Sequence, residues 1–147
     1  MPVIPESLPD LAAALRSGAL PLADYLTEIE ARVAAREPAV LALMAEPARW
    51  ERLRAAAAEL QARYPDPARR PPLFGVLVGV KDIFHVAGLL TTGGSRLPPQ
   101  VLAGPEAESV ARLTAAGALI LGKTVSTEFA YFGPGPTRNP HSPAGTP

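Results

Sequence analysis

The sequence predicts an α/β protein in which a helical preface is followed by the start of a mixed, largely parallel sheet covered by helices. Residues 1–64 carry apolar side chains at helical spacing, and a proline-rich stretch separates them from the rest. Beyond that stretch, two short apolar runs enclose a segment with helical periodicity, and strand–helix–strand order is typical of a parallel sheet. We therefore expect a preface at 1–64, a linker at 65–72 and the first part of a sheet-containing core at 73–147.

Three amphipathic helices are expected in the preface, because apolar residues recur there at i, i+3, i+4 and i+7. Their expected ranges are 8–17, 22–38 and 50–64. Ser7 is expected to cap the first helix, and Ser17-Gly18 to end it. Prolines end the other two. The apolar run at 40–44 is short and compatible with a strand.

The linker holds too many prolines for a helix or a central strand. Residues 73–80 are apolar, partly β-branched and bounded by turn residues, which predicts a buried strand. An irregular stretch follows at 87–104. It leads into a helix that should have Pro105 in its first turn and Gly117 as its C-terminal cap.

This last helix is expected to bury Val110 and Leu113. The apolar run at 118–121 then predicts a second buried strand, which ends at Gly122-Lys123. The final 15 residues hold five prolines and no large apolar side chain. They should therefore form a loop without a core of its own.

Composition argues against several classes of function. The 14 basic and 14 acidic side chains balance, which gives no reason to expect a nucleic-acid or anionic-membrane partner. No apolar run reaches the roughly 18 residues that cross a bilayer, and the amino-terminal segment lacks the basic region of a secretory signal. Cysteine is absent, so disulfides and thiol catalysis are excluded. We expect a cytoplasmic protein.

Lys81 is the first candidate for chemistry. It lies at the carboxyl end of the strand expected at 73–80, where α/β sheets place ligands and catalytic groups. A lysine held in an apolar site can lose its proton near neutral pH and act as a general base or a Schiff-base nucleophile. The residues alone also allow a structural role, in which the ammonium reaches solvent or pairs with a carboxylate.

Lys123, the other lysine of the chain, belongs to a second pattern. Gly117, four residues and then Gly122-Lys123-Thr124 satisfy the letters of a P-loop. The four intervening residues are themselves an expected strand, whereas a P-loop is a turn that leads from a strand into a helix. Nucleotide binding is therefore the weaker interpretation. It predicts a phosphate-dependent stabilisation that Lys123→Ala abolishes.

The other polar residues give weaker signals. His85 and His141 are too isolated for a metal site, because no third ligand lies at a suitable spacing. Ser95 is expected to stabilise a turn, and no serine lies in a G-x-S-x-G context. We expect neither a metal nor a cofactor.

Three blocks of sequence from residue 72 onward together resemble the amidase signature family. The blocks are PLFGVLVGVKDIFHVAGLLTTGGS at 72–95, ESVARLTAAGALILGKTVSTEFA at 108–130 and TRNPHSPAGTP at 137–147. They keep that family's order and spacing, and the first block is similar to the strand that delivers its catalytic lysine. The chain thus resembles the amino-terminal portion of an amidase, or of the corresponding subunit of an aminoacyl-tRNA amidotransferase.

The resemblance implies hydrolysis of an amide C–N bond by a Ser–cis-Ser–Lys mechanism. A nucleophilic serine attacks the carbonyl, and a second serine on a cis peptide bond bridges it to a lysine that acts as general base. Only the lysine maps onto this chain, as Lys81. The implied partner of the whole enzyme is a small-molecule amide, with no nucleic acid expected to contact this portion and no membrane.

Both serines of the family lie beyond the last residue of this chain. We therefore expect the 147 residues alone to be inactive, and marginal in stability because a sheet edge is left open. The alternative is a non-catalytic binding or interaction module derived from an amidase. The residues leave open the substrate, the oligomeric state and the choice between an amidase and an amidotransferase subunit.

Overall fold

The computed structural model describes residues 3–142, 144 and 145 of the chain. Its helices and strands are α1 (Leu8–Ser17), α2 (Leu22–Val40), α3 (Arg49–Arg63), β1 (Leu77–Lys81), α4 (Glu108–Ala115) and β2 (Leu119–Thr124). Three short 3-10 helices are η1 (Pro67–Arg69), η2 (Pro99–Leu102) and η3 (Glu128–Ala130). None of the helices in the described part of the chain is long and apolar enough to cross a membrane.

The chain forms two compact units, each built from segments that are distant in sequence. The first unit is Met1–Val33, Pro47–Val78 and Arg112–Leu121. The second unit is Ala34–Glu46, Gly79–Ala111 and Gly122–Pro147. Both strands pass from the first unit into the second, so each unit contains part of β1 and part of β2.

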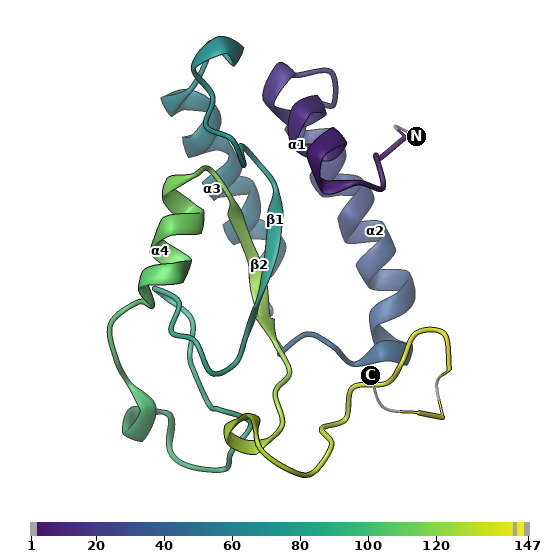
Figure 1. The fold of residues 1–147 in the computed structure, drawn as a ribbon, viewed down its shortest axis with the longest axis vertical. Helices are drawn as coiled ribbons and strands as arrows, with labels where there is room; N and C mark the ends of the chain where they lie inside the picture. The colour runs from purple at the N-terminus through teal and green to yellow at the C-terminus, as the bar shows by residue number, and fades with distance from the viewer. Residues whose placement is uncertain (1–2, 143, 146–147) are drawn as a thin grey trace. The chain divides into compact units, whose positions relative to one another are not determined.

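Strands β1 and β2 pair in a two-stranded sheet. The Leu119 amide donates to the Val76 carbonyl at 2.9 Å, and further along both strands the Asp82 amide donates to the Thr124 carbonyl at 2.9 Å. Because the partners advance in the same direction, the strands are parallel. Figure 1 shows them side by side, with α4 on the connection between them. The predicted strand–helix–strand unit and the α/β class are confirmed.

The first unit contains the main apolar core, which is contributed by α1, α2, α3 and the segment that leads into β1. Its buried members are Leu15, Leu20, Leu22, Tyr25, Leu26, Leu53, Ala57, Phe74, Val76 and Leu119. Helix α3 is also bound to β2 by a polar contact, since the Arg52 guanidinium donates to the carbonyls of Ile120 and Leu121 at 2.9 and 3.3 Å. The predicted helical stripes therefore pack as core faces.

The caps of α1 are as predicted, whereas α2 is longer than predicted. The Ser7 hydroxyl accepts from the Asp10 amide at 3.2 Å, and Gly18 ends α1 with a φ of 83°. Helix α2 continues past Pro38 to Val40 instead of ending near the proline. Its last turn still closes, because the Leu41 amide donates to the Glu37 carbonyl at 2.8 Å.

The expected strand at 73–80 begins only at Leu77, and in β1 only Val80 is buried. Residues before it form turns, in which the Val76 amide donates to the Leu73 carbonyl at 3.0 Å. Gly75 has a φ of 75°, and a β-carbon there would lie 2.7 Å from Leu22. The turn brings this segment against α2, so close packing of helix and loop overrides the strand propensity.

The linker is more ordered than expected. It contains η1, which begins with a proline in its first turn and is capped by Asp66, whose carboxylate accepts from the Ala68 amide at 2.9 Å. The Arg70 guanidinium donates to the Leu15, Arg16 and Tyr64 carbonyls at 3.2 to 3.3 Å. One cation thereby satisfies terminal carbonyls of α1 and α3, where the negative end of a helix dipole favours positive charge.

Two further expectations need correction. Pro105 lies before α4 rather than in its first turn, because the helix begins at Glu108; Val110 is buried, but Leu113 only partly. The run at 40–44 forms no strand, and only Leu43 makes an isolated antiparallel bridge, to Thr124. A φ of 56° at Leu41 interrupts the extended conformation that a longer strand would need.

Candidate active site

Lys81 is the last residue of β1, as expected for a group presented at the carboxyl end of a parallel strand. Its side chain is exposed and makes no hydrogen bond or ion pair with the residues that the structure describes. It lines a cavity of about 420 Å³ within the second unit. The described residues therefore leave the Lys81 side chain open to solvent.

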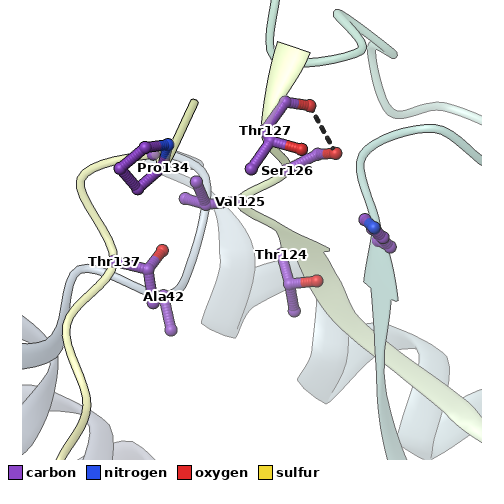
Figure 2. Close-up of a pocket in the computed structure, with 9 residues that line it drawn as sticks. Ala42, Thr124, Val125, Ser126, Thr127, Pro134 and Thr137 are labelled. Atoms are coloured by element: carbon purple, nitrogen blue, oxygen red, sulfur yellow. Dashed lines mark hydrogen bonds between the residues drawn. The ribbon is translucent and has the colours of Figure 1, made fainter. Parts of the chain in front are cut away.

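The other walls of this cavity come from β2, from the segment that follows it and from the proline-rich tail. They are formed by Ala42, Thr124, Val125, Ser126, Thr127, Pro134, Gly135 and Thr137. Figure 2 shows Thr124 on the strand and Ser126 and Thr127 beyond it, with Pro134 and Thr137 on the tail. The lining formed by described residues is rich in hydroxyl groups and contains no carboxylate, and Lys81 is its one charged side chain.

Hydrogen bonds to backbone carbonyls hold the tail beside this cavity. The Thr137 hydroxyl donates to the Leu41 carbonyl at 2.8 Å, and the Arg138 amide donates to the Val40 carbonyl at 2.8 Å. The described part of the tail after residue 132 contains no helix or strand, as predicted. It nevertheless forms a wall of the cavity, which its composition did not indicate.

Asp82, the residue after Lys81, lies on the buried side. Its carboxylate has no exposed surface and forms an ion pair with Lys123 at 2.9 Å. The Thr92 hydroxyl donates to the same carboxylate, and so does the Thr92 amide at 3.2 Å. Because successive side chains along a strand point to opposite faces, a buried Asp82 directs Lys81 toward the other face and the cavity.

Lys123 is buried within β2, with 4% of its surface exposed. Besides Asp82, its ammonium donates to the Thr91 hydroxyl at 2.8 Å and to the Leu90 carbonyl at 3.4 Å. These three acceptors match its three N–H donors. No donor is left for a phosphate.

The P-loop interpretation is therefore wrong. The segment between its glycines is strand β2 rather than a loop, and Gly117 has the left-handed conformation of a helix cap, with a φ of 94°. A β-carbon at Gly117 would lie 2.6 Å from Pro71, so its requirement for glycine follows from packing.

The ion pair changes the acidity of Asp82. Burial removes water from the carboxylate and opposes ionisation, but the hydrogen bond from the Thr92 hydroxyl and the hydrogen bond and charge of Lys123 outweigh it. Together they hold the pKa of Asp82 below its usual value. Asp82 is therefore a carboxylate at neutral pH, and it neutralises the buried Lys123 ammonium.

We expect the stability of the chain to fall in acid through this pair. The carboxyl has a pKa of about 3.9 in an unfolded chain and a lower pKa in the folded chain. Its contribution is thus complete above about pH 4 and is lost as the pH falls through the folded pKa, by at most about 1.4 kcal/mol per pH unit. Urea unfolding across this range should show a slope that Asp82→Asn makes shallower.

The control for this measurement is Val110→Ala, which truncates a buried apolar side chain in the same unit and changes no ionisable group. It should lower the free energy of unfolding by the same amount at every pH. An acid slope that is equal in wild type and Asp82→Asn would contradict the assignment.

The other candidates have structural roles. His85 Nδ1 lies 3.1 Å from the Thr91 hydroxyl, and His141 is exposed in a turn. The Ser95 hydroxyl donates to the Thr92 carbonyl at 2.8 Å, which is the expected turn contact. Among the residues described, no group of three or more His, Asp or Glu side chains is arranged to hold a metal ion.

Both lysines could be singled out from the sequence, but not their arrangement in space. The Asp82–Lys123 ion pair was not predicted, because the two residues are far apart in the chain. The sequence also did not indicate that Ser126 and Thr127 line a cavity. One sequence signal could have indicated that Asp82 is buried if Lys81 is exposed: side chains alternate along a strand, so Lys81 and Asp82 lie on opposite faces. The partner on the buried face could be found only from the fold.

The family model described as Amidase matches residues 25–147, which is most of the sequence. The chain belongs to the amidase family. The matched segment includes both strands, both lysines and the cavity.

Curated relatives of the chain agree with membership of this family. The glutamyl-tRNA(Gln) amidotransferase A subunit of Oleidesulfovibrio alaskensis is 42% identical over 125 residues, which are 85% of this chain and 25% of that protein. The protein of the same name from Thermus thermophilus is 47% identical over 81 residues, or 49% of this chain and 17% of that protein. The chain spans about a quarter of the length of relatives that it matches over most of its own length.

Solved structures show the same fold. A chain described as a vestigial protein complex that reveals the evolutionary origins of an s-triazine catabolic enzyme matches with a TM-score of 0.75 and 34% identity, over 90% of this chain and 30% of that one. A crystal structure of an amidase matches with a TM-score of 0.71 and 32% identity, over 88% of this chain and 30% of that one.

Proposed function

We propose that this chain is part of an amidase that hydrolyses a carboxamide C–N bond with Lys81 as general base. The contrast between the two lysines supports the proposal. Lys123 is buried and its ammonium has three partners, so none of its three N–H donors is left for a reacting group. Lys81 makes no such bonds with described residues and lines a cavity, where an amine could reach a reacting group.

In the proposed reaction a serine oxygen attacks the amide carbonyl carbon, and its proton passes through a second serine to the Lys81 amine. The intermediate collapses, the C–N bond breaks, and Lys81 returns the proton through the bridging serine to the leaving amine. Water then hydrolyses the acyl-serine to a carboxylic acid and regenerates the nucleophile. Neither of these serines is assigned to a residue of this chain.

We also propose that the 147 residues alone do not catalyse this reaction. Lys81 is exposed, so its amine lies open to water rather than enclosed with a substrate. Ser126 is the serine that lines the same cavity, and its hydroxyl donates to the Thr127 carbonyl at 2.8 Å. Its proton is thus engaged by the backbone, and Ser126 is not positioned as the nucleophile.

A second candidate is the corresponding component of a glutamine-dependent amidotransferase, which would release ammonia from an amide for transfer to an aminoacyl-tRNA. Its support is the name of the relative that is 42% identical over 85% of this chain. In that case the amide substrate would be glutamine. The chemistry assigned to Lys81 would be the same.

Ammonia release tests both candidates. The protein expressed from the whole reading frame should release ammonia from at least one member of a panel that contains glutamine, asparagine and simple aliphatic and aromatic carboxamides. Preference for glutamine would favour the amidotransferase, and preference for another amide a general amidase. The 147-residue chain should release none. Turnover by that chain, or none by the whole protein, would contradict the corresponding proposal.

A further inference from the structure

The buried lysine of the site has no role in the reaction proposed above. A buried ion pair stabilises a fold inefficiently, because the cost of desolvating two charges offsets most of their attraction. Apolar side chains of similar volume often stabilise a core equally well. Stability alone therefore does not explain the Asp82–Lys123 ion pair, whose acidic member is the residue that follows Lys81.

Asp82 is fixed by hydrogen bonds of both its backbone and its side chain. Its amide donates to the Thr124 carbonyl of β2 at 2.9 Å, and its carbonyl accepts from the Gly93 amide at 2.9 Å. Its carboxylate binds Lys123 of β2 and both donors of Thr92. The backbone from which Lys81 projects is thus attached to β2 on one side and to the loop at 91–94 on the other.

The same loop is packed against Ser126 and Thr127, two other residues that line the cavity. A β-carbon at Gly94 would lie 2.5 Å from the Ser126 carbonyl oxygen and 2.9 Å from that of Thr127, so the two backbones are in direct contact. The Phe129 amide also donates to the Gly93 carbonyl at 2.7 Å. The carboxylate of Asp82 therefore binds a loop that touches Ser126 and Thr127, which line the same cavity as Lys81.

We propose that the Asp82–Lys123 ion pair positions the Lys81 amine relative to the cavity wall at Ser126 and Thr127. The inference rests on the proposed function, since it requires Lys81 to act in the reaction. Asp82 and Lys123 are positioning residues, because neither lines the cavity. Breaking the pair leaves the chemical groups of the cavity in place but loosens the strand end that carries Lys81.

The test is steady-state kinetics of the whole protein on its best amide. Asp82→Asn keeps the shape of the side chain and removes its charge, and Lys123→Met keeps the length of the side chain and removes its charge. Each should lower kcat about 10- to 100-fold, because a shift of the order of 1 Å in a catalytic group has effects of that size. KM should change by less than about threefold, since groups that only bind substrate are unaltered.

A milder variant covers the case in which both substitutions prevent folding. Thr92→Val removes one hydrogen bond to Asp82 and keeps the ion pair, so it should lower kcat about threefold to tenfold. Val110→Ala is the matched control: it truncates a buried apolar side chain of the same unit and removes none of the charged or hydroxyl groups of the network, so its kcat should equal that of wild type.

The outcomes separate the two proposals. If Lys81→Met retains turnover, the proposed function itself fails. If Lys81→Met is inactive while Asp82→Asn, Lys123→Met and Thr92→Val keep the wild-type kcat, only the positioning role is overturned. A loss of kcat in Val110→Ala as large as in the pair variants would also overturn it, because the loss would then follow from stability alone.

Discussion

Replacing Lys81 with methionine should lower kcat/KM of the whole protein for its amide by about 10²- to 10⁴-fold, the range associated with loss of a general base. Methionine keeps the length of the side chain and cannot accept a proton. The Lys81 side chain has no hydrogen bond or ion pair among the described residues, so the substitution removes no polar contact seen there. Ammonia release under substrate-limited conditions measures the change.

Lys81→Arg distinguishes a base from a positive charge. Arginine stays protonated in proteins, so it preserves the charge but not the ability to take up a proton. We expect Lys81→Arg to lose as much activity as Lys81→Met. Arg96→Met, which removes an exposed cation elsewhere in the second unit, should have wild-type activity. An active Lys81→Arg variant would show that Lys81 acts through its charge.

Replacing Phe74 with alanine should lower the free energy of unfolding by about 3–5 kcal/mol, the usual cost of truncating a buried aromatic side chain. The Phe74 ring is 1% exposed and belongs to the core of the first unit. The Arg70 guanidinium lies 4.4 Å from the ring centroid, so a cation–π contact is lost as well. Urea unfolding of the 147-residue chain, followed by circular dichroism, measures the loss.

Phe132→Ala is the matched control, because the same atoms are removed from a side chain that is 79% exposed. Its effect should stay within about 0.5 kcal/mol, as for most surface substitutions. Equal losses for the two variants would mean that Phe74 does not contribute to a cooperative core. If wild type itself shows no cooperative transition, the two-unit fold would not be stable in the isolated chain.

Much of the local structure was predictable because it depends on neighbours in the sequence. The cap at Ser7, the stop at Gly18 and the cap at Gly117 were all correctly predicted. Each depends on a side chain or backbone conformation that acts within one helical turn. The end of β1 at Lys81 was also predictable, since the run of apolar residues stops there.

The predictions were wrong where contacts with distant segments override the local preference of a residue run. Residues 73–76 have the composition of a strand, but they turn so that Phe74 enters a core built from three helices. The run at 40–44 has the composition of a strand too, yet a left-handed Leu41 leaves it with a single bridge. In both cases packing outweighs a local preference that is itself small.

The sequence by itself determined the α/β class, the resemblance to amidases and the residue proposed as base, because periodicity and motifs are local and are encoded in chain order. Only the tertiary structure decided what surrounds the two lysines. It buries Lys123 against Asp82 and leaves Lys81 facing a cavity. A buried charge must find its counter-charge in space rather than along the chain, and the pairing of two parallel strands brings these residues together.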